Sequence, residues 1–272
     1  MQNKIIKIYL ISIMSKDFIV FFEGGEGSSA IMSHLKQFTE KLDIIWFEPF
    51  DNCHFTNKLI DDDLSNIFSN IFNKNIKKNY NENIRQIYSN YTDRQLADFD
   101  KNKSVGFKMR FRDWDTIKPI IIKNNVVIFL LVRKNIVKWA ISKYGSNSLQ
   151  FKLIKGEIKE NPKTNINIKQ FEKILKRCRE SIDYKYSLFK KLKMEGVEVY
   201  LIYYEDYCEN KTIFLNSILR KININLDLEK VKEIATKNIH FKKVHSDDIK
   251  TFVTNYDEFY KFIADNDLLE YI

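Results

Sequence analysis

Three glycines and two serines lie close together in the segment FFEGGEGSSAIMSHL, directly after an apolar run. Glycines at this spacing allow positive φ angles and a close approach of the backbone to a ligand, and a helix that begins at the serines adds unpaired N–H groups. A tight strand-to-helix turn without a ligand would have the same pattern, so the motif needs a second site beside it. We expect a phosphate-binding turn formed by Gly24, Gly25, Glu26, Gly27, Ser28 and Ser29.

A P-loop nucleotide kinase requires a lysine and then a serine or threonine after the last glycine. The lysine contacts the terminal phosphates and the hydroxyl binds magnesium. In this chain Ser28 follows Gly27 directly, so the lysine is missing. The kinase hypothesis is therefore weakened, whereas a phosphate site built from backbone N–H groups stays compatible with the sequence.

A second candidate site follows the apolar run at 126–132, which ends in Arg133. Ligands of open α/β sheets bind beyond the carboxyl ends of the strands, where this arginine would lie. Ser142 comes nine residues later, on the helix that we expect next. A guanidinium and a hydroxyl at this place can hold a phosphate. Together with the glycine-rich turn, they imply a ligand with two phosphate groups.

Apolar runs suited to buried strands must position these residues, and they recur with helical stretches between most of them. This alternation predicts an α/β fold with a doubly wound, mainly parallel sheet flanked by helices. The run at 126–132 is apolar on both faces, as in a central strand. Apolar residues at three- and four-residue steps predict an amphipathic helix over about 167–194, which Gly196 ends. The strands are expected at 18–22, 44–47, 105–109, 126–132 and 197–203.

The 272 residues are enough for one α/β domain with a buried core or for two small domains, and the low content of three prolines and seven glycines argues against disordered linkers. We expect a single domain. Residues 1–14 are interpreted as an extension. The polar segments 56–104 and 143–166 are interpreted as insertions on the acceptor side of the sheet, where substrate-selecting surfaces lie.

The formal charge of +9 fits an anionic ligand, although a lysine-rich composition also follows from a biased genome. No sustained basic stripe or nucleic-acid motif is present, so no nucleic acid partner is expected, and an RNA-binding module stays a third alternative. The N-terminal apolar run is interrupted by Lys7 and is too short to span a membrane.

The cysteines and histidines suggest neither disulfides nor a metal site. Three cysteines without CxxC spacing indicate a reducing compartment, and we expect a cytoplasmic protein. The four histidines never pair at metal-ligand spacing, so no metal is expected.

Four segments in the same order resemble the sulfotransferases that use 3′-phosphoadenosine 5′-phosphosulfate (PAPS), especially the carbohydrate and bacterial branches. The segment GEGSS resembles the 5′-phosphosulfate loop, usually K/R-S-G-T/S-T/S, and VIFLLVRKNIVKWAISKY resembles the 3′-phosphate motif. The block LIYYEDY is similar to the strand-YED-helix block, and KKVHSDDIKTF to the closing segment. The resemblance implies that Arg133 and Ser142 bind the 3′-phosphate, Tyr204 lies near the adenine and Lys243 contacts the cofactor.

One departure from the family pattern is that Gly25 stands where the family has a basic residue. Lys108 is the candidate replacement, because VGFKMRF reads as a strand that ends near the same site and resembles the family's Lys-x-His segment. Arg110 then takes the place of the histidine, and an arginine stays protonated and cannot act as a base.

Sulfuryl transfer to a hydroxyl needs a base on the acceptor oxygen and cations along the donor. We assign the base to Glu48, which stands in the apolar context IWFEPF, where burial would raise the pKa of its carboxyl; the family often has a glutamate in a similar context. A strand-end carboxylate paired with a lysine is the alternative for Glu48. His54 is the second candidate.

The sequence therefore predicts a PAPS-dependent sulfotransferase that acts on a hydroxyl or amine of a small-molecule or glycan acceptor, with 3′-phosphoadenosine 5′-phosphate (PAP) as product. The alternatives are a catalytically weakened nucleotide- or glycan-binding relative and a P-loop nucleotide kinase.

Overall fold

The computed structural model describes residues 15–45, 71–72, 100, 102–110, 114–144, 163–239 and 248–272. Three predicted site residues, Glu48, His54 and Lys243, lie outside the described residues. So do the extension at 1–14 and most of the two segments interpreted as insertions.

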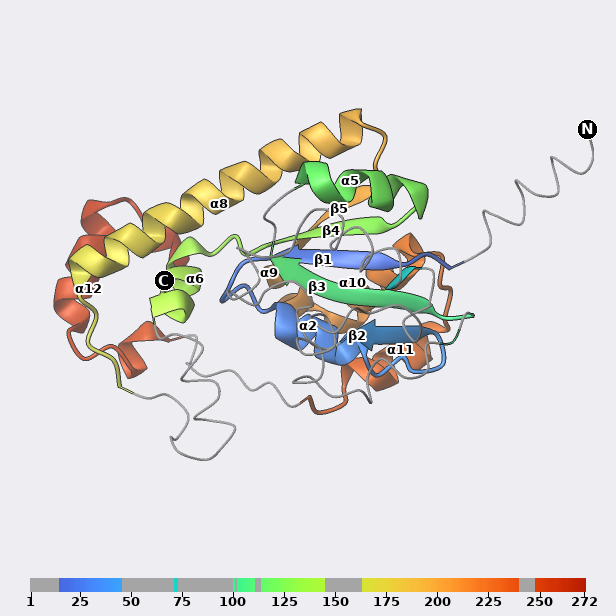
Figure 1. Cartoon of the computed structure of the whole chain (residues 1–272). Helices are drawn as coiled ribbons and strands as arrows, with labels where there is room; N and C mark the ends of the chain where they lie inside the picture. The colour runs from blue at the N-terminus through green and yellow to red at the C-terminus, as the bar shows by residue number, and fades with distance from the viewer. Residues whose placement is uncertain are drawn as a thin grey trace, which may run out of the picture.

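Five parallel strands form one sheet in the order β2-β3-β1-β4-β5. Helices lie on both faces of the sheet (Figure 1), so the predicted α/β class with a doubly wound sheet is confirmed. Each strand overlaps one of the expected runs, with ends displaced by two residues or fewer. The strands are β1 (Phe18–Phe22), β2 (Leu42–Ile45), β3 (Ser104–Arg110), β4 (Val127–Val132) and β5 (Val199–Tyr203).

Helices α5 and α8 cover one face of the sheet, and α2, α10 and α11 cover the other (Figure 1). Helix α6 follows β4, α9 follows β5, and α12 lies near the C-terminus. The helical bounds are α2 (Ser28–Leu35), α5 (Trp114–Lys123), α6 (Ile136–Tyr144), α8 (Ile168–Met194), α9 (Tyr204–Glu209), α10 (Lys211–Lys221), α11 (Leu228–Ala235), α12 (Tyr256–Asp265) and the short 3₁₀ helices η1 (Ile249–Thr251) and η2 (Leu269–Tyr271).

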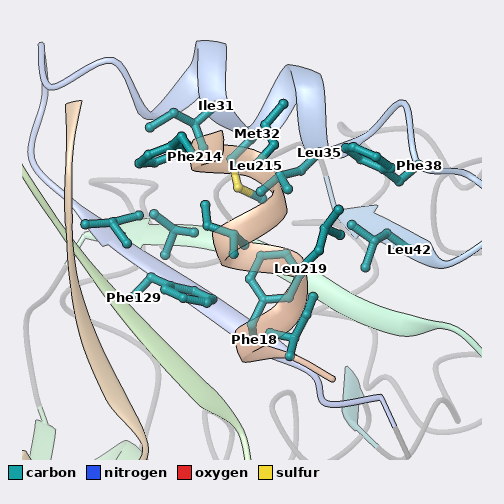
Figure 2. Packing of buried hydrophobic residues seen from close by; sticks show 14 of the residues in the cluster. Phe18, Ile31, Met32, Leu35, Phe38, Leu42, Phe129, Phe214, Leu215 and Leu219 are labelled. Carbon is teal, nitrogen blue, oxygen red and sulfur yellow. The ribbon is translucent and has the colours of Figure 1, made fainter. Parts of the chain in front are cut away.

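Strand β1 is buried along its whole length, and its side chains alternate between the two faces. Ile19 and Phe21 pack in the cluster shared with α5 and α8, whereas Phe18 and Val20 pack in the cluster shared with α2 and α10. Figure 2 shows this second cluster, where Met32 of α2 and Leu215 of α10 meet above the sheet. Both faces of β1 are therefore apolar because both are covered by helices.

The central position of β1 places the glycine-rich turn at the middle of the sheet edge. The strand lies between β3 and β4, and the chain leaves its carboxyl end through residues 23–27 into α2. All strands are parallel, so the carboxyl ends of β3 and β4 come to the same edge. The reversal of strand order at β1 is the position where open α/β sheets bind ligands.

Helix α8 is the longest helix described, with 27 residues, and its bounds match the predicted 167–194. The side chain of Asn167 caps its first turn by accepting from the N–H of Gln170, and Gly196 has a φ of 73° just past its end. Its first half packs with α6 and α12 in a third apolar cluster, and its second half packs on the sheet. Helix α8 thus joins the cluster around α6 and α12 to the sheet.

A buried hydrogen bond ties α2 to α9. Nδ1 of His34 lies 2.7 Å from the hydroxyl of Tyr207, and the imidazole is fully buried. Burial, followed by the positive charge of Lys211, lowers the pKa of His34 below its ordinary value. The neutral ring is therefore the form that the folded state prefers.

This histidine should make the stability depend on pH. The unfolded chain binds the proton of His34 more readily than the folded one, so the free energy of unfolding should fall as the pH drops from about 6.5 through the lower folded-state pKa. His34→Asn removes the titration and should flatten this part of the curve. Urea unfolding of both proteins between pH 7.5 and 5 gives the free energy of unfolding at each pH. The same pH dependence in the wild type and in His34→Asn would contradict the assignment.

Candidate functional site

The glycine-rich turn contains two residues in the left-handed region, Gly25 with φ of 83° and Gly27 with φ of 89°. Gly27 is the N-cap of α2, and its carbonyl accepts from the N–H groups of Ala30 and Ile31. No side chain caps this helix within the part of the chain that the structure describes. The N–H groups of Ser28 and Ser29 are therefore not bound by a capping side chain, and uncapped N–H groups at a helix start can bind an anion.

The ring of Tyr204 occupies the space where a side chain at position 27 would lie. A Cβ atom on Gly27 would be 2.1 Å from Cε2 of this ring. The same ring lies under the guanidinium of Arg133, whose Cζ is 4.9 Å from the ring centroid. The start of α9, directly after β5, is thus in direct contact with the turn after β1, and a glycine is required for that contact.

Arg133 binds the turn itself, because its Nη1 donates to the carbonyl of Gly25 at 2.8 Å. The carboxylate of Glu205 accepts from the backbone N–H groups of Lys134 at 3.0 Å and Asn135 at 2.9 Å. The Tyr-Glu-Asp segment therefore contacts this region twice. Glu205 binds the backbone directly after Arg133, and the ring of Tyr204 lies against the guanidinium of Arg133.

Ser142 lies next to the turn from α6. Its Oγ is 3.2 Å from the Cβ position of Gly25, and the backbone N of Lys143 is 3.4 Å from the same point. The side chain of Lys143 also forms an ion pair with Glu23, at 3.6 Å. The turn and the Arg133–Ser142 pair are therefore adjacent, so one ligand can reach both.

Two basic residues of β3 reach the same edge of the sheet. In the register of β1 and β3, Val20 pairs with Lys108 and Phe22 with Arg110. Nζ of Lys108 donates to Oγ of Ser29 at 2.8 Å and lies 4.7 Å from the centroid of the Phe22 ring. Arg110 lies farther along the strand, with Nη2 3.9 Å from the Cβ position of Gly24. Lys108 thus brings positive charge to the serines at the start of α2.

A buried ion pair lies behind the turn. The carboxylate of Glu26 is fully buried, and Nζ of Lys185 on α8 donates to both of its oxygens at 2.5 Å. The same ammonium donates to the carbonyl of Leu131 at 2.5 Å, and the N–H of Glu23 donates to Oε2 of Glu26 at 2.6 Å. Burial raises the pKa of Glu26 and lowers the pKa of Lys185, and each charged partner opposes the effect on the other.

A cavity of about 330 Å³ adjoins the turn on the α8 face of the sheet. Phe21 and Leu130 line it from the strands, and Tyr184 and Leu188 from α8. The lining also includes the carboxylate-bearing residues Glu23 and Glu180, with Ser181 and Lys185. A mainly apolar space with a few polar groups at its side is suited to a small organic molecule.

The described residues that the sequence singled out for the site come together at the carboxyl edge of the sheet. Among these, Glu26 differs from the expectation in one respect: its side chain is directed into the protein and is bound to Lys185. Its N–H donates to the carbonyl of Glu23 at 3.3 Å, within the turn.

Sequence reasoning missed three residues that hold the site in place: Lys185, Glu205 and Trp139. The indole Nε1 of Trp139 donates to the carbonyl of Gly24 at 2.9 Å. For Lys185 a signal exists, because it lies seven residues after Cys178 and three before Leu188 on the buried stripe of α8. A lysine on such a stripe indicates a buried partner.

Within the described ranges, no cluster of histidine, cysteine or acidic side chains has the arrangement of a metal site. Among the helices that the structure describes, none combines the length and the hydropathy that a membrane crossing requires.

No protein family model and no curated protein matches the sequence. Several solved structures have a similar arrangement of the chain. A sulfotransferase from Alicyclobacillus acidocaldarius is 12% identical, with a TM-score of 0.43 and coverage of 92% of both chains. The sulfotransferase domain from the curacin biosynthetic pathway is 14% identical, with a TM-score of 0.40 and coverage of 85% of this chain and 81% of that domain.

Retinol dehydratase, in complex with androsterone and the inactive cofactor PAP, is 11% identical, with a TM-score of 0.45. The alignment covers 92% of this chain and 80% of that protein. At these identities the likeness concerns the fold alone.

The contact between Tyr204 and Gly27 predicts a large effect of a single methyl group. Gly27→Ala would place Cβ 2.1 Å from the ring and force alanine to a φ of 89°. The left-handed conformation costs about 1–2 kcal/mol and the overpacking about 1–3 kcal/mol more, so the free energy of unfolding should fall by roughly 3 kcal/mol.

Gly196→Ala is the matched control, because Gly196 also has a positive φ, of 73°, but nothing lies within 4 Å of its Cβ position. That variant should lose only the backbone part, about 1–2 kcal/mol. Urea unfolding of both variants gives the comparison, and equal losses would show that the Tyr204 ring does not constrain position 27.

Proposed function

We propose that this protein is a PAPS-dependent sulfotransferase that transfers a sulfuryl group to a hydroxyl or amine of a small-molecule or glycan acceptor. The observation that carries the proposal is the adjacency of the glycine-rich turn and the Arg133–Ser142 pair at one sheet edge. A nucleotide with two phosphate groups requires two such anion sites within its own length. The sequence resemblance to the superfamily points to the same nucleotide.

The donor groups of the site fit such a nucleotide. The start of α2 offers N–H groups to one phosphate, and the guanidinium of Arg133 with the hydroxyl of Ser142 suits the other. A Cβ atom on Gly25 would lie 3.2 Å from Oγ of Ser142, so the missing side chain allows the turn and Ser142 to approach each other closely. The aromatic ring of Tyr204 offers a surface beside both groups. PAPS would supply the activated sulfuryl group, and these residues would hold and orient it.

Lys108 is proposed to supply the positive charge that is missing at Gly25. Its ammonium reaches the hydroxyl of Ser29 at 2.8 Å, and its side chain is only 7% exposed. A cation in a poorly solvated place acts more strongly on developing negative charge than one in water. Arg110, in the place of the family's histidine, stays protonated and can add to the positive potential but cannot accept a proton.

Glu48 remains the proposed base, with His54 as the second candidate, and the acceptor is proposed to enter from the side of the segments at 56–104 and 143–166. The cavity beside Glu23 fits a small-molecule acceptor by its volume and lining. A cytoplasmic location is part of the same proposal, since Cys178 and Cys208 are free thiols.

A catalytically weakened nucleotide- or glycan-binding relative is the second candidate, because Gly25 replaces the basic residue of the loop. Such a protein would bind PAP without turnover. A nucleotide kinase is disfavoured by the absence of a lysine after Gly27. It would be stabilised by ATP with magnesium and not by PAP, so a thermal-shift comparison of the two ligands separates these cases.

Arg133→Ala should weaken PAP binding by roughly 10- to 100-fold, because charge-assisted hydrogen bonds contribute about 1.5–3 kcal/mol. Isothermal titration calorimetry measures the affinity. Arg220→Ala is the matched control, since Arg220 is an exposed arginine near the end of α10. Equal PAP affinity in wild type and Arg133→Ala would exclude the 3′-phosphate role.

Glu48→Gln tests the base. The amide keeps the size of the side chain but cannot accept the acceptor's proton, so turnover should fall by 100-fold or more, on the order of general-base contributions. PAP affinity should stay within about twofold of wild type, since the base contacts the acceptor and not the nucleotide. His54→Gln is the parallel variant, and unchanged turnover in Glu48→Gln would reject the assignment of Glu48.

A further inference from the structure

We propose that the buried ion pair between Glu26 and Lys185 positions the glycine-rich turn for its ligand, so that nucleotide affinity depends on α8. The inference rests on the proposed function, because the ligand is the phosphorylated nucleotide assigned to the turn. It assigns to the side chains of Glu26 and Lys185 a role other than contact with the phosphates.

Lys185 connects three parts of the fold through one ammonium group. Its Nζ donates to both carboxylate oxygens of Glu26 and to the carbonyl of Leu131, all at 2.5 Å. A lysine ammonium has three N–H donors, so these three acceptors satisfy it. The turn, the end of β4 and the middle of α8 are therefore held at one point.

Glu26 also forms a hydrogen bond within the turn. Its Oε2 accepts from the N–H of Glu23 at 2.6 Å, while the carboxylate stays bound to Lys185. Between these two residues lie Gly24 and Gly25, which have no side chains to pack. Glycine backbones lose the most conformational entropy on folding, so a turn of this composition needs specific contacts to keep one shape.

Close packing does not surround the turn on every side, because Lys185 and Glu23 both line the cavity of about 330 Å³. A turn beside open space can move when its polar contacts are removed, whereas a turn enclosed by close-packed side chains cannot. Glu26 and Lys185 are themselves 0% and 4% exposed. The pair is thus the buried contact that fixes the turn on the side of α8.

Stability does not by itself require such a pair. Taking two charges out of water is costly, and apolar side chains of similar size often replace a buried ion pair without loss of stability. Apolar side chains, however, cannot accept from Glu23 N–H or donate to the Leu131 carbonyl. A positioning role therefore predicts that replacement of both residues leaves the stability nearly unchanged but weakens the binding of the nucleotide.

The experiment compares Lys185→Met with the double variant Glu26→Met/Lys185→Met. The single variant leaves an uncompensated buried carboxylate and should lower the Tm by roughly 10 °C. The double variant removes both charges and should return to within about 4 °C of wild type. The matched control is Lys118→Met/Glu195→Met, which removes an ion pair of 3.1 Å at the C-terminal end of α8.

Two readouts apart from stability decide the question. In the ligand-free double variant, amide hydrogen exchange in residues 23–27 should be at least tenfold faster than in wild type, with β1 and β4 unchanged. PAP affinity should fall at least tenfold by calorimetry. The control variant should match wild type in both measurements.

The inference would be overturned by a double variant whose amide exchange in residues 23–27 and whose PAP affinity both equal those of the wild type. If the wild-type protein does not bind PAP, the proposed function fails. In that case the exchange of residues 23–27 alone shows whether the pair holds the turn.

Discussion

Gly27 lacks a side chain, and the ring of Tyr204 fills the space that a side chain would need. This contact brings the start of α9, directly after β5, against the turn that follows β1, although β4 lies between β1 and β5 in the sheet. The guanidinium of Arg133, at the end of β4, lies over the same ring and binds the carbonyl of Gly25. The segments that follow three neighbouring strands therefore contact one another, and the arrangement of the site depends on these contacts.

The charges around this turn are compatible with the proposed anionic ligand, although the turn contains two glutamates. Glu23 is paired with Lys143 and Glu26 with Lys185, so both carboxylates are compensated by basic residues. Lys108 and Arg133 then add positive charge at the same edge of the sheet. Because the helix start contributes its own positive potential, the balance near Ser28 and Ser29 favours a negative ligand.

The strands and the long helix were predictable because apolar residues that become buried follow a regular spacing along the local sequence. The apolar runs at 18–22 and 126–132 correspond to β1 and β4, and the three- and four-residue spacing predicted α8 to within one residue at its start. Strand β2 begins at Leu42, two residues before the predicted start at 44. Strand ends depend on pairing with neighbours, which no local pattern contains.

The residues of the candidate site were predictable where the local backbone or the end of a strand by itself requires a certain residue type. Glycines that need positive φ and an arginine directly after a buried strand are such cases, and the sequence determined both. Only the tertiary structure decided that Glu26 faces inward to Lys185, a residue 159 positions away, and that Glu205 caps the backbone after Arg133. Those contacts depend on how helices and strands far apart in the chain pack together. Local periodicity records which face of an element is buried, but not which partner it meets.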